Sequence, residues 1–257
     1  MSNHYHLVLK VNEDQAASWS DKEVVERWAK LFRLSKANEL ISSKLNDKDL
    51  IGHQDKIDQW RKQLYDISWF MRVLNEGIAR QANQEENCRG RFWEGRFRSQ
   101  ALLDETALLT CMAYVDLNPI RAKISKTPES SDFTSIQERI RMVKKQRQPK
   151  GLAALQTKNQ KVDHLPIELT TYIDLVDTSG RILKVDKKGS IPQHLKPILQ
   201  RLGINHKHWL STLQHFETEF EGFIGTPKEM EALKNKKGMQ RARGMSACKK
   251  IFLSKVA

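Results

Sequence analysis

Two histidines near the start of the chain are of a type and spacing that could hold a metal ion. His4 and His6 lie in NHYHLVLK, residues 3–10, an alternating stretch rich in β-forming residues. We therefore expect a strand with both imidazoles on one face. Side by side, two imidazoles are natural ligands for one divalent cation. The alternative is a pair of ordinary surface or core histidines, and this short motif alone favours that alternative.

A hydroxyl and an amide are paired on a later segment that is expected to be helical. Residues 105–118 follow a capping residue, Asp104, and end before Pro119. Tyr114 and Asn118 are four residues apart, so they share one helix face. The same pattern predicts a buried stripe formed by Leu108, Cys111, Met112 and Val115. Taken in isolation, both polar residues are better explained by structural roles.

Two basic segments have the composition of nucleic-acid contacts. The first alternates arginines with aromatic residues around Glu94 and Gly95, which predicts a hairpin over residues 91–103 with aromatics mostly buried and a basic exposed face. Its arginines are Arg89, Arg91, Arg96 and Arg98. The second is a basic helix over residues 135–148, which contains Arg139, Arg141, Lys144, Lys145 and Arg147. This helix could hold a DNA stem or simply present a solvated face.

Further elements are expected along the chain to position these groups. The patterns predict a helix capped by Ser20, helices within residues 36–66, a helix over residues 68–83 capped by Ser68, and a hairpin over residues 171–186 that turns at Ser179 and Gly180.

Composition limits the classes of function. The 257 residues carry 44 Lys and Arg against 31 Asp and Glu, a formal charge of +13, which favours polyanionic partners such as nucleic acid. No apolar run is long enough to cross a bilayer, so we expect no membrane partner and a cytoplasmic protein. Three widely spaced cysteines argue against a disulfide framework or a cysteine zinc site.

Three motifs in order resemble a known family. NHYHLVLK, RGRFWEGRFRSQALLD and AYVDLNPIRAKI are together similar to the IS200-like tyrosine transposases, especially the branch associated with repetitive extragenic palindromes. The resemblance covers about the first half of the chain and implies a single-tyrosine HUH nuclease. It implies that His4 and His6 bind the metal, that Tyr114 is the nucleophile, and that Asn118 fills the third-ligand position.

The resemblance also implies a fold. We expect an α+β protein with an incomplete ferredoxin-like antiparallel sheet in an IS200-like domain, residues 1–126, followed by a basic, mainly helical region, residues 127–257. The domain would lack its first strand and helix, as if the chain were truncated at its N-terminus, and would carry a helical insertion at about residues 12–66.

The implied reaction is cleavage and transfer of single-stranded or hairpin DNA through a 5′-phosphotyrosyl link, assisted by Mg²⁺ or Mn²⁺, with zinc as an alternative. DNA contacts would come from the first four arginines together with Arg121, Arg141, Lys144 and Lys145. A bacterial, nucleoid-associated location follows, and a homodimer is one option. The alternatives are a truncated or domesticated derivative that binds DNA without cutting it, and a metal-dependent hydrolase that uses water.

Overall fold

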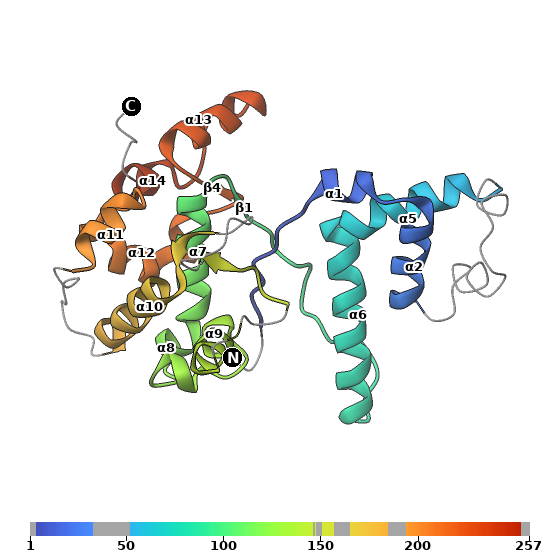
Figure 1. The fold of residues 1–257 in the computed structure, drawn as a ribbon, viewed down its shortest axis with the longest axis horizontal. Helices are drawn as coiled ribbons and strands as arrows, with labels where there is room; N and C mark the ends of the chain where they lie inside the picture. The colour runs from blue at the N-terminus through green and yellow to red at the C-terminus, as the bar shows by residue number, and fades with distance from the viewer. Residues whose placement is uncertain are drawn as a thin grey trace. The chain divides into compact units, whose positions relative to one another are not determined.

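A computed structural model describes residues 4–32, 52–145, 147, 151–156, 165–184 and 194–252 (Figure 1). The chain divides into two compact units. Unit 1 comprises Met1–Val8 and Ser99–Ala257, and unit 2 comprises Leu9–Arg98. The expected helical insertion at residues 12–66 belongs to unit 2, although residues 33–51 lie outside the described part. The expected boundary between residues 126 and 127 falls inside unit 1.

In its described part, unit 2 is helical. Its helices are α1 (Glu13–Ser18), α2 (Asp21–Leu31), α5 (Gln54–Tyr65) and α6 (Ile67–Glu85). The predicted cap of α2 is confirmed, because Ser20 Oγ accepts from the Glu23 amide while the Glu23 carboxylate accepts from the Ser20 amide. The predicted Ser68 cap of α6 is wrong. Asp66 occupies that role and accepts from the Trp69 amide at 2.6 Å.

Tryptophans pack together in the core of unit 2, beside the buried side chains of Val24, Val25 and Ile57. The ring of Trp28 stacks on Trp60 at 5.5 Å and on Trp69 at 6.1 Å between centroids. Arg61 of α5 connects α5 to two other helices. Its guanidinium pairs with the Asp21 carboxylate of α2 at 2.7 Å and donates to the Ala16 carbonyl of α1 at 3.0 Å. Its donors therefore satisfy groups at helix ends that would otherwise lack partners.

Unit 1 contains a longer series of elements. Its helices are α7 (Glu105–Asp116), α8 (Asn118–Arg121), η1 (Pro128–Ser130), α9 (Ser135–Lys144), α10 (Leu169–Lys184), α11 (Lys196–Arg201), α12 (His206–Glu219), α13 (Pro227–Lys236) and α14 (Met245–Ile251). Its strands are β1 (Ala101–Leu102), β2 (Leu155–Gln156), β3 (Leu165–Glu168) and β4 (Phe223–Ile224). The described fold is therefore mixed and mostly helical.

The strands form two short parallel pairs, β1 with β4 and β2 with β3. In the first pair, Ala101 lies opposite Phe223 and Leu102 lies opposite Ile224. The ferredoxin-like antiparallel sheet is consequently not confirmed. The strand expected over residues 4–10 is wrong, since these residues form no strand. β-Propensity alone does not make a strand, because its backbone donors and acceptors need a neighbouring strand.

Both predicted hairpins are also wrong. Residues 91–100 contain no strand, and the chain pairs only at β1, with a segment more than a hundred residues away. The second predicted hairpin is helix α10. Its buried residues Tyr172, Leu175, Val176 and Ser179 follow helical spacing, so the helical period prevails over the turn signal.

Gly180 has a packing role in α10. A Cβ at this position would lie 3.0 Å from Leu117 Cδ2 and 3.1 Å from Ile120 Cδ1. The missing side chain thus lets α10 approach the junction of α7 and α8 closely. Beside it, Ser179 accepts a hydrogen bond at 2.9 Å from the buried indole of Trp209.

Helix α7 runs through the middle of unit 1 (Figure 1). Its predicted cap is confirmed, since Asp104 accepts from the Ala107 amide at 2.9 Å. The predicted stripe holds only in part: Met112 is buried, whereas Leu108, Cys111 and Val115 are half-buried. The buried set extends to the opposite side and includes Thr110, Ala113, Tyr114 and Asp116. Helix α7 is therefore covered on most sides.

After Asp116 the chain makes a further helical turn. Leu117 keeps a right-handed helical conformation and α8 begins at once, with Pro119 in its first turn, where a missing amide hydrogen costs nothing. Asn118 thus begins α8 and does not end α7. No helix in the described parts of either unit is long and apolar enough to span a membrane.

The close approach at Gly180 generates a stability prediction. Gly180→Leu should lower the free energy of unfolding by about 1–3 kcal/mol, because the new side chain must displace Leu117 and Ile120. The matched control is Gly77→Leu in α6, which meets nothing within 4 Å of the added Cβ and replaces a poor helix former. Urea unfolding measures both, and equal stability of the two variants would contradict the packing role.

Candidate functional site

Within unit 1, the structure places His4 and His6 close to Tyr114 of α7. The His4 and His6 rings lie 5.2 Å apart between centroids, edge to face. The His6 ring lies 6.0 Å from the ring of Tyr114 on α7. We refer to these three residues together with Arg121 and Glu217 as the His–Tyr cluster.

The phenol of Tyr114 is enclosed. Tyr114 is 3% exposed, its ring stacks on Phe216 of α12 at 4.7 Å, and the Arg121 guanidinium lies 4.1 Å above the ring centroid. The pKa of Tyr114 is raised to about 12; burial is the main cause, Arg121 acts to lower the pKa, and Glu217 acts to raise it. At neutral pH the hydroxyl is therefore a neutral donor, not a phenolate.

Glu217 is a member of the cluster that sequence reasoning missed. Its Oε1 atom lies 3.5 Å from His6 Nε2, and its side chain is 61% exposed. It comes from α12, in the part of the chain that carries no recognised motif. No local pattern marks it, because its position beside His6 arises only when α12 packs against α7.

Arg121 was expected to contact DNA but faces inward. Its guanidinium covers the Tyr114 ring, and Nη2 donates to the Gln214 carbonyl at 3.4 Å. Nη1 is buried with no hydrogen-bond partner among the described residues. The cation is consequently held against the phenol, where it favours the ionised form of the hydroxyl.

The residues fit a divalent cation in part. His6 Nε2 is buried without a hydrogen-bond partner among the described residues, and burial, as the largest effect, lowers the pKa of His6, which favours the neutral form that ligates metals. The neighbouring imidazole of His4 supplies a second donor. Within the described ranges, however, no three His, Cys, Asp or Glu side chains gather closely enough to hold a metal ion. A third ligand would have to be an amide, water or the substrate.

Asn118, the expected third ligand, is 8% exposed in the first turn of α8. Its Nδ2 atom is buried with no hydrogen-bond partner in the described parts of the chain. An unsatisfied buried amide is costly, so this side chain has polar capacity that the described fold does not use.

A second polar group on α7 went unnoticed in the sequence. Asp116 is 1% exposed and accepts three hydrogen bonds, from Ser135 Oγ at 2.6 Å, the Ile136 amide at 3.0 Å and Tyr172 Oη at 2.6 Å. Arg139 lies near this carboxylate and is 2% exposed, so it is not part of a solvated basic face. The group joins α7, α9 and α10 through one buried carboxylate.

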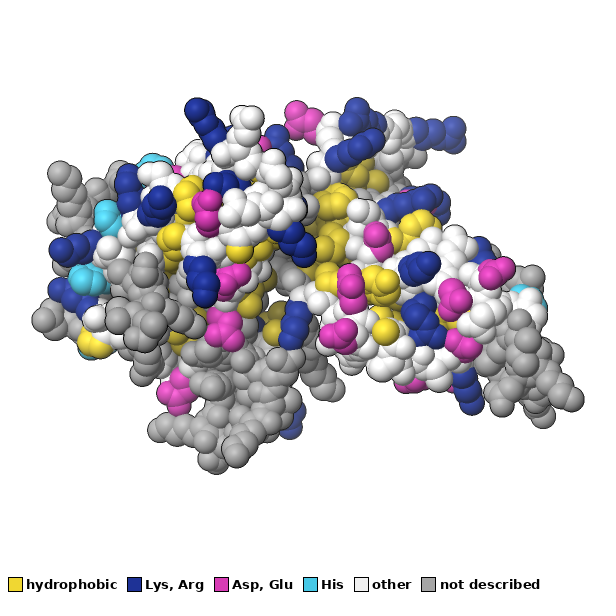
Figure 2. All heavy atoms as spheres, turned by 90° about the horizontal axis from the view of Figure 1, so that it is seen from above, with side chains coloured by type: hydrophobic (Ala, Val, Ile, Leu, Met, Phe, Trp, Pro, Cys, Tyr) yellow, Lys and Arg dark blue, Asp and Glu magenta, His cyan; other side chains and the backbone are white. Residues whose placement is uncertain are grey.

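The other expected DNA-binding residues lie in both units. Arg89, Arg91, Arg96 and Arg98 belong to unit 2, and all are exposed. Arg141 and Lys145 belong to unit 1 and are exposed, whereas the side chain of Lys144 lies outside the described part. On the face in Figure 2, Lys and Arg side chains are interspersed with Asp and Glu and form no single patch.

The expectation that the aromatics of residues 91–103 would be mostly buried is wrong for two of them. Phe92 is 43% exposed and Phe97 is 36% exposed. Only Trp93 is half-buried, and its indole donates to the Asn75 carbonyl of α6 at 2.9 Å.

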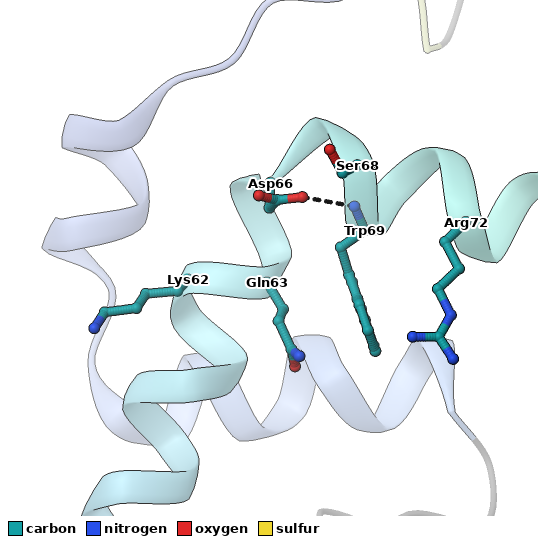
Figure 3. A pocket seen from close by; sticks show the side chains of 6 residues that line it. All are labelled: Lys62, Gln63, Asp66, Ser68, Trp69 and Arg72. Carbon is teal, nitrogen blue, oxygen red and sulfur yellow. Dashed lines mark hydrogen bonds between the residues drawn. The ribbon is translucent and has the colours of Figure 1, made fainter. Parts of the chain in front are cut away.

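Two open hollows lie in unit 2, and neither is lined by a residue of the His–Tyr cluster. The first, of about 420 Å³, is lined by Lys62, Gln63, Asp66, Ser68, Trp69 and Arg72 (Figure 3). There the Arg72 guanidinium lies 4.9 Å from the Trp69 ring, and the Asp66 carboxylate is used as the α6 cap. The second hollow, of about 430 Å³, lies at the other end of α6 and is bounded by Arg80 and Arg89. Neither contains a nucleophile paired with a base.

No protein-family model, curated protein or solved structure matches this chain.

The enclosed phenol generates a titration prediction. Tyr114 should remain neutral at about pH 11, where an exposed tyrosine is mostly ionised, because burial raises its pKa from 10.0 to about 12. Since the unfolded chain releases this proton first, the contribution of Tyr114 to stability falls as the pH rises from 10 towards 12. The difference in phenolate absorbance between wild type and Tyr114→Phe measures the pKa. Glu217→Gln should lower it, and a Tyr114 pKa near 10 in the folded protein would contradict this environment.

The buried carboxylate generates a second pH prediction. Burial raises the pKa of Asp116 above 3.8, so its unfolded form loses the proton first as the pH rises. The folded state therefore loses stability relative to Asp116→Asn between about pH 3 and pH 7, by about 1.4 kcal/mol for each pKa unit. Urea unfolding of both proteins at the two pH values tests this. A difference that stays constant, or that moves in favour of wild type, would contradict the raised pKa.

Proposed function

We propose that this protein is a single-stranded DNA endonuclease and strand transferase of the IS200-like type, with Tyr114 as the nucleophile. The observation that carries the proposal is the juxtaposition of His4, His6 and Tyr114, which come from distant parts of the sequence. Two imidazoles can hold a divalent cation beside the phenol, and a phenol is a possible nucleophile for metal-assisted transesterification at a phosphodiester.

Each side chain of the cluster has a role in this reaction. Tyr114 Oη attacks the phosphorus and loses its proton, the bond from phosphorus to the 3′-oxygen breaks, and the leaving oxygen takes up a proton as a free 3′-hydroxyl. The DNA remains joined to the enzyme through a 5′-phosphotyrosyl link. Arg121 favours the ionised phenol and can offer Nη1 to a phosphate oxygen.

His4 and His6 would hold the cation, and the side-chain oxygen of Asn118 would be the third protein ligand. A bound Mg²⁺ or Mn²⁺ would polarise the phosphate and offset developing negative charge. Because the phosphotyrosyl link retains the energy of the broken bond, the 3′-hydroxyl of a second strand can attack it and regenerate Tyr114. Joining therefore needs no nucleotide cofactor.

The charge of the chain supports a DNA substrate. A formal charge of +13 attracts a polyanion, and exposed arginines in unit 2 and on α9 offer phosphate contacts.

A second candidate function is DNA binding without cleavage, and the burial of Tyr114 favours it. At 3% exposure, beneath Arg121 and against Phe216, the ring leaves little room for a phosphodiester unless its covering side chains move. In such a protein the cluster would be part of the core.

The two functions are distinguished by a covalent adduct between the protein and DNA, which only the nuclease would form. With a single-stranded DNA hairpin and Mg²⁺ or Mn²⁺, the nuclease should form a covalent DNA adduct that survives denaturing electrophoresis and disappears in Tyr114→Phe. His6→Ala should reduce the adduct by at least about a hundredfold, because one imidazole alone holds a cation poorly. Tyr65→Phe, in unit 2, is the matched control and should leave the adduct unchanged.

Other outcomes are equally informative. Binding without any adduct, unaffected by Tyr114→Phe, would support the binding function. Cleavage that persists in Tyr114→Phe would instead indicate that water is the nucleophile and would overturn the proposed role of the phenol.

A further inference from the structure

The loop that follows α6 is anchored to α6 by hydrogen bonds. We refer to residues 89–98, with the sequence RGRFWEGRFR, as the aromatic–arginine loop. Its entry uses two positive φ values, 48° at Asn87 and 124° at Gly90, and Asn83 Nδ2 donates to the Gly90 carbonyl at 3.1 Å. The bond from the Trp93 indole to the Asn75 carbonyl anchors its middle on α6.

Arg91 has an internal role in this loop. Its Nε donates to the Trp93 carbonyl at 2.8 Å, and its Nη2 donates to the Glu94 carbonyl at 2.6 Å. These bonds fold the backbone around the guanidinium. Arg91 therefore shapes the loop, although the sequence suggested the same role for it as for its neighbours.

Two aromatic rings of the loop are left facing solvent. Phe92 is 43% exposed and Phe97 is 36% exposed, and Phe92 is supported from one side by the edge-to-face contact of its ring with Trp93 at 4.9 Å. Exposure of such rings carries a hydrophobic cost, and a fixed, supported ring presents a face on which a planar group can stack.

The remaining arginines of the loop lie close to these rings in the sequence. Arg89, Arg96 and Arg98 are exposed, and none forms an ion pair with another described residue. Glu94 is the sole acidic residue of the loop. Arg96 and Arg98 flank Phe97 in the chain, so cationic and aromatic groups alternate at the spacing of one residue.

We propose that the aromatic–arginine loop is a stacking surface for single-stranded DNA, with Phe92 and Phe97 against bases and Arg89, Arg96 and Arg98 against phosphates. Single strands fit because their bases can leave the stack and lie on an aromatic ring, whereas paired bases in a duplex cannot. The choice of DNA rests on the proposed function, but binding by this loop does not require cleavage.

The test measures binding of the full-length protein to a labelled short oligothymidine by fluorescence anisotropy, with a chelator present so that no cleavage occurs. Phe92→Leu and Phe97→Leu should each weaken binding about tenfold, since an aliphatic side chain of similar size cannot stack. Phe92→Trp should retain the wild-type affinity. Phe133→Leu is the control, because Phe133 is an exposed phenylalanine that lies in unit 1 between Asp132 and Thr134.

Salt dependence separates the phosphate contacts from stacking. Arg96→Ala and Arg98→Ala should each reduce the slope of log affinity against log salt by about 0.7, whereas the two Phe→Leu variants should leave that slope unchanged. Arg181→Ala is the control for loss of an exposed arginine, because this residue pairs with Asp177 in unit 1.

Three results would overturn the proposal. The first is that Phe92→Leu and Phe97→Leu bind the oligothymidine as tightly as Phe133→Leu does. The second is equally tight binding of a duplex of the same length, and the third is displacement of the oligothymidine by an acidic peptide at equal charge concentration. Each variant is checked for the wild-type unfolding midpoint, and Phe92→Trp tests the surface even if a Leu variant is unstable. Normal binding by Tyr114→Phe without any adduct in wild type would reject the nuclease while leaving the loop surface intact.

Discussion

The burial of α7 is the constraint on which unit 1 depends. A helix covered on most sides must satisfy every polar side chain it carries, because an unpaired buried group costs free energy comparable to a lost hydrogen bond. Asp116 meets this requirement with donors from α9 and α10, and Thr110 donates to the Thr106 carbonyl one turn earlier. These bonds fix which elements can surround α7, and therefore which residues can approach Tyr114.

The same burial sets the chemistry of the phenol. A low-dielectric setting keeps Tyr114 protonated, and the nearby carboxylate of Glu217 adds to this effect. Positive charge is what a nucleophilic phenol needs, and Arg121 already supplies one such charge at 4.1 Å from the ring centroid. The cluster thus combines charged and titratable side chains with a low-dielectric setting that disfavours charge, and the two proposed functions differ in which of these effects dominates.

In unit 2, the stacked tryptophans and the hydrogen bonds of Arg61 hold the helices together. In the loop after α6, the side chains of Arg91 and Trp93 form hydrogen bonds that stabilise the conformation of the loop. Arginines that look alike in the sequence therefore differ in role: Arg61, Arg91 and Arg139 serve the fold, whereas Arg96 and Arg98 remain available to a partner. The total number of positive charges in the chain is therefore larger than the number that a polyanion can contact.

By itself, the sequence determined the local features of this protein. The caps at Ser20 and Asp104, the helices α2, α6 and α7, and the basic character of the chain follow from residue types within a few positions of one another. Tertiary structure decided the rest. Residues 4–10 form no strand despite their β-forming composition, α10 is a helix because its apolar residues pack on one side, and Glu217 lies beside His6 because α12 packs on α7. Pairing, packing and burial involve residues far apart along the chain, and short-range patterns carry no record of those contacts.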